Sequence, residues 1–96
     1  MDVLVTYDIA TIDRAGERRL AKVAAVCERY GDRVQYSVFA CRVSEVGYVR
    51  LLKELTDVLD PSTDRVDVYR IQGSIKESRT SLGQAVRREL GSPWIL

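Results

Sequence analysis

Residues 4–23, "LVTYDIATIDRAGERRLAKV", decide the fold of this protein. They begin inside the apolar run Val3–Tyr7, whose β-branched and aromatic side chains predict a central strand covered on both faces. The run stops at Asp8, residues 10–16 are expected to form a loop, and a helix is predicted over residues 17–30. Apolar side chains recur along this helix at spacings of three and four residues, at Leu20, Val23, Ala24, Cys27 and Tyr30. Gly31 then stands where a left-handed C-terminal cap is expected.

The chain continues to alternate between extended and helical patterns. Residues 33–43, "RVQYSVFACRV", predict either one bent strand or two short strands joined at Tyr36 and Ser37. Ser44 is a good N-cap for a second helix, which the Asp60–Pro61 pair should end. Residues 65–71, "RVDVYRI", predict a last strand. This order indicates an α+β protein with a ferredoxin-like βαββαβ sandwich over residues 1–73.

Residues 74–96 predict an additional C-terminal strand and a tail. The stretch 74–82 favours a short edge strand, "QAVRREL" (84–90) a helical turn, and "PWIL" (93–96) is too apolar to be a free end. Helices on one side of a four-stranded sheet leave the other side without cover, and a second copy of the chain is the obvious source. We therefore expect a homodimer, and we expect the apolar C-terminal residues to dock on another surface.

The composition narrows the chemistry. Fifteen basic and 14 acidic residues give a net charge of +1, so a basic surface must come from local arrangement. The sequence has no histidine, which removes the commonest general base and the commonest zinc ligand. Cys27 and Cys41 lack metal-ligand spacing, and we expect both to be buried and reduced. A hydrolase with this composition would use carboxylates and a hard cation, Mg²⁺ or alternatively Mn²⁺.

No signal peptide or apolar run of about 20 residues is present in the sequence. The expectation is a cytoplasmic protein without a membrane partner.

Asp8 has two interpretations. An aspartate after a strand often caps the following turn. Alternatively, a residue at the carboxyl end of a central strand points into a crevice. One carboxylate is a weak metal ligand, but in a two-fold dimer Asp8 could meet its own copy, and a divalent cation would offset their repulsion. That cation could polarise a phosphodiester and activate water, which makes Asp8 the candidate catalytic and metal-binding residue.

Basic side chains follow Asp8 closely. Because they do not favour the helix dipole near a helix N-terminus, phosphate contact is one reason for their placement, and a solvated helical face is the alternative. Two further arginines flank the middle strand segment, with the same alternatives. Two aromatic side chains either line the crevice or belong to the core. The candidate nucleic-acid-binding residues are Tyr7, Arg14, Arg18, Arg19, Lys22, Arg33, Phe39 and Arg42.

Three stretches resemble one known family, the CRISPR-associated protein 2 family. They are "LVTYDI" (4–9), "RRLAKVAAVCERYGDRVQYSVFAC" (18–41) and "LTDVLDPSTDRVDVYRI" (55–71). The ending "GSPWIL" resembles the subgroup with a short C-terminal extension. The resemblance implies ferredoxin-like homodimers in which the C-terminal strand extends the partner's sheet. It also implies that Asp8 is the metal-dependent cleavage residue, and that Tyr7, Arg18, Arg19 and Phe39 occupy motif positions lining the same cleft.

The resemblance further implies a CRISPR-associated, Mg²⁺-dependent endonuclease that takes part in spacer acquisition for antiviral defence. Double-stranded DNA is the favoured substrate and single-stranded RNA the second. The alternative is a non-catalytic DNA-binding adaptor that bridges CRISPR integrase dimers. The chain departs from the family where a glutamate usually follows S-V-F, because here that residue is Ala40. If the missing carboxylate helps to hold metal, the departure weighs against cleavage and leaves the adaptor role unaffected.

Overall fold

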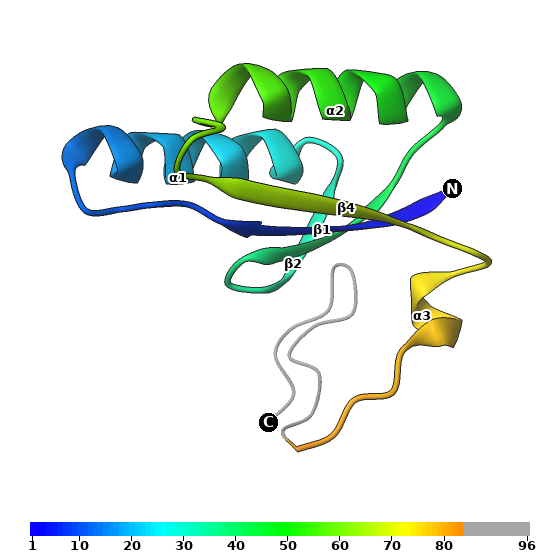
Figure 1. The fold of residues 1–96 in the computed structure, drawn as a ribbon. Helices are drawn as coiled ribbons and strands as arrows, with labels where there is room; N and C mark the ends of the chain where they lie inside the picture. The colour runs from blue at the N-terminus through cyan, green and yellow to red at the C-terminus, as the bar shows by residue number, and fades with distance from the viewer. Residues whose placement is uncertain (84–96) are drawn as a thin grey trace.

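The first strand, β1 (Asp2–Asp8), lies inside a four-stranded antiparallel sheet of order β2-β3-β1-β4. This arrangement comes from a computed structural model that describes residues 1–83. The other strands are β2 (Gly31–Gln35), β3 (Val38–Arg42) and β4 (Arg65–Ile71). Two helices, α1 (Arg14–Glu28) and α2 (Glu45–Val58), lie side by side over one face of the sheet (Figure 1). The predicted α+β, ferredoxin-like fold is confirmed.

The core lies between the sheet and these two helices. Alternate residues of β1 point toward the helices, and Val3 and Val5 have no exposed surface. They pack with residues of β3, α1 and α2 that include Phe39, Cys41, Val23, Cys27, Leu51 and Leu55. The expectation that β1 is covered on both faces is wrong for this single chain. Its other face carries Leu4 and Thr6, which are only half-buried, and the exposed Asp8.

The middle segment forms two short strands, which decides between the two sequence alternatives. Tyr36 and Ser37 make the turn between β2 and β3. Gly31 is not the left-handed cap expected from the sequence, because positive φ angles occur only at Gly73 and Gly83 within residues 1–83. It is the first residue of β2, and a Cβ there would lie 2.1 Å from the carbonyl oxygen of Ala40. Gly31 therefore allows the two strands to approach closely.

The start of α1 differs from the sequence prediction, whereas the N-cap of α2 agrees with it. α1 begins at Arg14 instead of residue 17, because the Asp13 carboxylate accepts a hydrogen bond of 2.8 Å from the Gly16 amide and caps the first turn. The predicted loop is therefore shorter. Ser44 caps α2 as predicted, accepting from the Gly47 amide at 3.1 Å.

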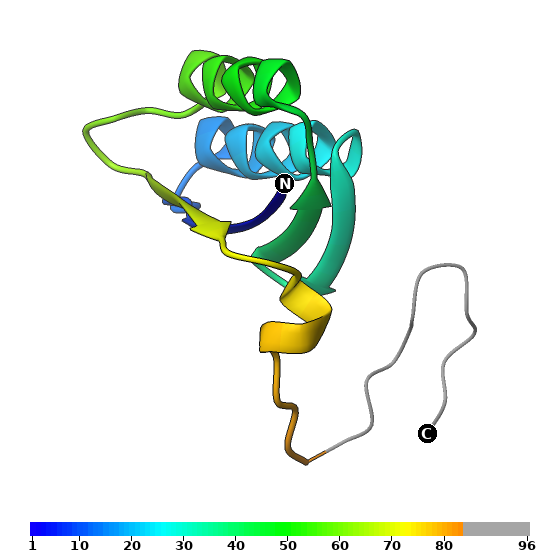
Figure 2. The ribbon, with the colours of Figure 1, turned by 90° about the vertical axis from the view of Figure 1, so that its right-hand side faces the viewer.

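The chain after β4 forms the one-turn helix α3 (Ile75–Ser78) and not the edge strand expected over residues 74–82. The Ser74 hydroxyl accepts from the Glu77 amide at 3.0 Å, and the Asp2 carboxylate accepts from the Ile75 amide at 2.9 Å. Such capping bonds compete with strand pairing. α3 lies on the side of the sheet opposite α1 and α2 (Figure 2). The predicted helical turn (84–90) and docked end (93–96) fall outside the described residues.

Within residues 1–83, no helix has the length and apolar character needed to cross a membrane.

Candidate functional site

Asp8 is the last residue of β1 and is exposed on what we call the open face, the sheet face opposite α1 and α2. Its partner in the antiparallel register is Arg65 at the start of β4. Directly opposite residues in such a pair have Cβ atoms about 5 Å apart, so the side chain of Arg65 starts beside that of Asp8 on the same face. Arg65 also donates from Nε to Oδ2 of Asp67 at 2.9 Å on the same face. Within residues 1–83, no group of three or more His, Cys, Asp or Glu side chains could hold a metal ion.

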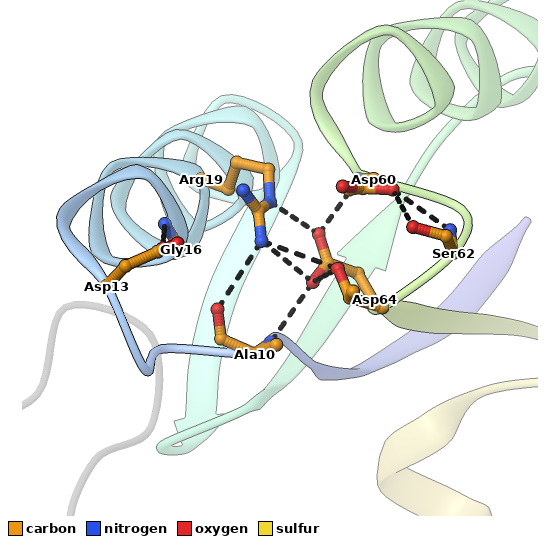
Figure 3. A network of polar contacts seen from close by, with 8 residues as sticks. Ala10, Asp13, Gly16, Arg19, Asp60, Ser62 and Asp64 are labelled. Carbon is orange, nitrogen blue, oxygen red and sulfur yellow. Dashed lines mark hydrogen bonds and ion pairs between the residues drawn. The ribbon is translucent and has the colours of Figure 1, made fainter.

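The chain that leaves Asp8 is fixed by a polar network that joins the β1–α1 loop, the helix α1 and the α2–β4 loop (Figure 3). The Ala10 amide donates to Oδ1 of Asp64 at 3.0 Å. The Ala10 carbonyl accepts from Nη2 of Arg19 at 3.4 Å. Both polar groups of Ala10 are thus held, only two residues after the candidate catalytic side chain.

Asp64 is the centre of this network. Its side chain has no exposed surface, and it accepts from Nε of Arg19 at 2.8 Å and from the Asp60 amide at 2.8 Å. The Arg19 guanidinium, together with the amides of Asp60 and Ala10, holds the pKa of Asp64 well below its ordinary value despite burial. The carboxylate therefore stays charged and links α1, the β1–α1 loop and the α2–β4 loop.

The neighbouring cations behave differently from Arg19. Arg14, Arg18 and Lys22 are exposed and lie four residues apart along α1, so they share one side of the helix. We call these three residues the basic row. Within residues 1–83 none of them makes an ion pair or a side-chain hydrogen bond. The structure therefore leaves the basic row available to an anion and commits Arg19 to Asp64.

The basic row and Asp8 lie at the same end of the protein but not on the same face. α1 begins near the carboxyl end of β1 and runs back along the sheet (Figure 1). The side chain of Asp8 points to the open face, whereas α1 covers the other face. The single crevice expected from the sequence is therefore not formed by one chain.

Tyr7 and Phe39 both pack in the core, and Tyr7 also lines a groove between α1 and the β2–β3 turn. Phe39 has no exposed surface, Tyr7 is 6% exposed, and their rings stack with centroids 6.2 Å apart. Burial raises the pKa of Tyr7, whose hydroxyl donates to the Tyr36 carbonyl at 3.2 Å. The Arg33 guanidinium carbon lies 5.1 Å from the centroid of the Phe39 ring. Phe39 can therefore support Arg33 but cannot itself contact a nucleic acid in this structure.

Arg33 and Arg42 each have one acidic neighbour. Arg33 lies 4.0 Å from Glu28, and Arg33 also lines a groove of about 310 Å³ between α1 and the β2–β3 turn. Arg42 donates from Nε to Asp2 at 2.9 Å, but 79% of its side chain remains exposed. This contact is the main cause of the lowered pKa of Asp2. Both arginines keep exposed surface that a phosphate could reach.

Neither Asp64 nor Arg65 was singled out from the sequence. The sequence did contain information on the location of both residues, because the ferredoxin-like order places the last strand beside the first and antiparallel to it. The residues that start the last strand then lie beside those that end the first. Arg65 is the first residue of "RVDVYRI" and Asp64 directly precedes it, so both were candidates for neighbours of Asp8 and Ala10.

The fold and the site define a ferredoxin-like α+β protein that carries an exposed strand-end carboxylate and a row of free cations suited to a polyanion. Comparison with known proteins makes the class specific. The family model described as CRISPR associated protein Cas2 matches residues 1–79. The chain therefore belongs to the Cas2 family, as the motifs predicted.

Two curated relatives and one solved structure illustrate the similarity. The chain is 36% identical over 96 residues, 100% of both chains, to a protein of Moorella thermoacetica named CRISPR-associated endoribonuclease Cas2 1. It is 39% identical over 95 residues, 99% of both chains, to the CRISPR-associated endonuclease Cas2 of Halalkalibacterium halodurans. Crystalline Cas2 of Streptococcus pyogenes matches 86% of this chain and 100% of its own, with a TM-score of 0.79 and 41% identity.

Proposed function

We propose that this protein is a metal-dependent endonuclease of the CRISPR system that cleaves phosphodiester bonds as a homodimer. The observation that carries the proposal is the exposure of Asp8 on the open face, at the end of β1. The names of the two relatives, an endoribonuclease and an endonuclease, support a nuclease activity. The lack of histidine supports carboxylate chemistry.

A second copy of the chain is the proposed cover of the open face. This face holds a hollow of about 400 Å³ lined largely by apolar side chains, among them Leu4, Val38, Ile71 and Ile75. Pairing two open faces about a two-fold axis would bury these groups and favour association. It would also bring Asp8 toward Asp8 of the partner subunit, which is the carboxylate that one chain lacks.

The donor chemistry fits Mg²⁺, with Mn²⁺ as the alternative, but only if both protomers contribute. Carboxylate oxygens are the ligands that Mg²⁺ prefers, and Asp8 of each protomer would hold it. When bound, the cation would polarise the scissile phosphodiester and help to activate water. The basic row would bind the phosphate backbone at the same end of the protein as Asp8 but on the helix side, and Arg65, on the neighbouring strand, would add positive charge on the face that carries Asp8.

The proposed substrates are double-stranded DNA first and single-stranded RNA second. Contacts to phosphates position a nucleic acid without reading its bases, so the basic row accepts either backbone. The name of the Moorella relative favours RNA, and that of the Halalkalibacterium relative is neutral between the two. Both substrates therefore belong in the same assay.

The test compares Asp8→Asn with Asp57→Asn, an exposed carboxylate paired with Lys53 on α2. Cleavage of duplex DNA and single-stranded RNA is measured with Mg²⁺ and with a chelator. We expect Asp8→Asn and the chelator to abolish cleavage, and Asp57→Asn to leave it unchanged. Undiminished cleavage by a purified Asp8→Asn protein would show that the site is wrong.

A second candidate function is a non-catalytic adaptor that binds duplex DNA and holds CRISPR integrase dimers apart during spacer acquisition. What supports it is that Ala40, on β3, supplies no carboxylate at a position where the family resemblance leads us to expect glutamate. An adaptor needs the dimer and the basic row but no metal. Spacer acquisition should then survive Asp8→Asn and be lost on charge reversal at Arg14 and Arg18. Loss of acquisition in Asp8→Asn would contradict the adaptor as a separate, metal-free role.

A further inference from the structure

The two adjacent arginines of the "RRL" motif do different work. Arg18 is exposed, whereas the side chain of Arg19 is 21% exposed and reaches toward the α2–β4 loop. Arg19 uses Nε for Asp64 at 2.8 Å and Nη2 for Ala10, Thr63 and Asp64 at 3.4, 3.5 and 3.4 Å. Two of the three nitrogens of this guanidinium, Nε and Nη2, are thus bound to groups of its own chain, which fixes the orientation of Arg19 toward the α2–β4 loop.

These contacts converge on the segment that carries Asp8. The Ala10 amide is bound by Asp64 and the Ala10 carbonyl by Arg19, so the peptide groups on both sides of the Ala10 Cα are held (Figure 3). Ile9, between Asp8 and Ala10, is 7% exposed and packs in the core. On the other side Asp8 is held by its ladder pairing with Arg65. The position of the Asp8 backbone therefore depends on two anchors, the ladder before it and the Ala10 contacts after it.

We propose that Arg19 and Asp64 are positioning residues, which clamp Ala10 and thereby fix where Asp8 leaves β1. The link from this clamp to cleavage rests on the proposed function of Asp8. A carboxylate is needed at position 64 because it accepts on both oxygens, from Ala10 on one and from Arg19 and Asp60 on the other. Asparagine has one acceptor oxygen and can serve only one of these sides.

The first measurement does not depend on activity. Amide hydrogen exchange is followed by NMR in the full-length protein and in Asp64→Asn, Arg19→Gln and the control Asp57→Asn. We expect exchange at Ala10 to accelerate on the order of tenfold or more in the first two variants, because the amide loses its ordered acceptor. The Val3 and Val5 amides of β1 should keep their protection, which shows that the fold is intact. Unchanged exchange at Ala10 would overturn the clamp.

The second measurement separates positioning from phosphate contact. Arg19→Gln should lower kcat on the order of 10- to 100-fold, since an ångström of misplacement has that effect, and leave KM and the salt dependence of binding unchanged. Arg18→Gln should do the reverse, raising KM and reducing the salt slope by about one. The double variant Arg19→Gln/Asp64→Asn should lose no more kcat than the more damaging of the two single variants, because the two residues act as a unit.

The outcomes distinguish the two proposals. If Asp8→Asn cleaves normally, the proposed function fails, and the exchange rate of Ala10 still decides whether the clamp exists. If Asp8→Asn is inactive while Arg19→Gln raises KM and lowers the salt slope as Arg18→Gln does, Arg19 contacts phosphate. The clamp role is then overturned and the nuclease proposal stands.

Discussion

Gly16→Ala is the most informative single change, because an alanine there would meet the backbone that follows Asp8. Gly16 is the third residue of α1, and an ideal Cβ at this position would lie 1.9 Å from the Ala10 carbonyl oxygen. Real Cβ contacts do not fall below 3.0 Å, so the two segments must separate by about 1.1 Å. That oxygen is the acceptor of the Arg19 hydrogen bond, so the separation also breaks the clamp.

The magnitude follows from two opposing terms. Backbone shifts forced by added volume cost about 1–3 kcal/mol, and the upper end applies here because the obstacle is a backbone atom. Alanine's higher helix propensity returns about 1 kcal/mol. A net loss of about 2 kcal/mol should lower Tm by roughly 8–16 °C in a domain of this size. At temperatures where the Gly16→Ala variant is still folded, its rate of cleavage should be about 100-fold lower than that of the wild type, because the chain beside Asp8 is displaced by about an ångström.

Gly47→Ala is the matched control. Gly47 is also the third residue of a helix and also donates its amide to the N-cap side chain, here Ser44. A Cβ at Gly47 would meet only side-chain atoms of Val43 and Ser44, at 3.3 and 3.4 Å. Its Tm should range from no change to a rise of roughly 4–8 °C, and cleavage should be unaffected. If Gly16→Ala and Gly47→Ala change Tm by the same amount in a thermal scan, the close approach of α1 to Ala10 is not what requires glycine at position 16.

Three further predictions follow from burial and charge. Because its folded pKa lies below the ordinary value of 3.8, Asp64 stabilises the protein above about pH 4, and this contribution is lost as pH falls toward the folded pKa. The Tm difference between wild type and Asp64→Asn should therefore shrink as the pH falls from about 5 to about 2, because the Asp64 carboxylate takes up a proton first in the unfolded chain and only at lower pH in the folded protein. Burial raises the pKa of Cys27 to about 12 and of Cys41 to about 11, so a thiol reagent should label them only after unfolding. Phe39→Leu should lower Tm by a few degrees, on the order of 1 kcal/mol of lost packing, without changing affinity for nucleic acid; weaker binding at unchanged Tm would show that the ring itself contacts the ligand.

Local periodicity was enough to predict most of the elements. The β-branched run of β1, the apolar stripe of α1 and the alternation of β4 each bury a definite face, and the order of these elements then leaves few folds available. Ser44 was predictable as a cap because its side chain acts on an amide only three residues away. These features depend on contacts within a few residues, which a single sequence displays directly.

Other features depend on distant contacts and were not predictable in the same way. α3 replaces an expected strand partly because Asp2, at the other end of the described chain, binds the Ile75 amide. The choice between one bent strand and a hairpin over residues 33–43 depended on how β3 pairs with β1. Gly31 was expected to adopt a left-handed conformation, but its real constraint is the Ala40 carbonyl on the neighbouring strand. In each case the deciding partner lies beyond the three or four residues over which a local pattern acts.

The candidate site shows the same division. Asp8 was predictable because the end of a buried strand is visible in the sequence, and the structure places it, exposed, on the open face. Arg18 and Arg19 were not separable, since two adjacent arginines after a strand look alike in sequence. What separates them is Asp64, which lies 45 positions beyond Arg19 and binds only one of the two. The role of each arginine is therefore a tertiary property.

This separation explains how a protein with a net charge of +1 can present a surface for a polyanion. Adjacent residues of a helix are rotated by about 100°, so Arg19 turns toward the loops while Arg18 stays in line with Arg14 and Lys22. The buried carboxylate of Asp64 neutralises the cation that holds the backbone and leaves the basic row uncompensated within residues 1–83. Replacing Asp64 with a neutral residue would raise the net charge but should not improve phosphate binding, because Arg19 would keep its contacts with Ala10 and Thr63 and Asp8 would lose its fixed position. The pairing of charges, more than their number, determines which cations can reach a nucleic acid.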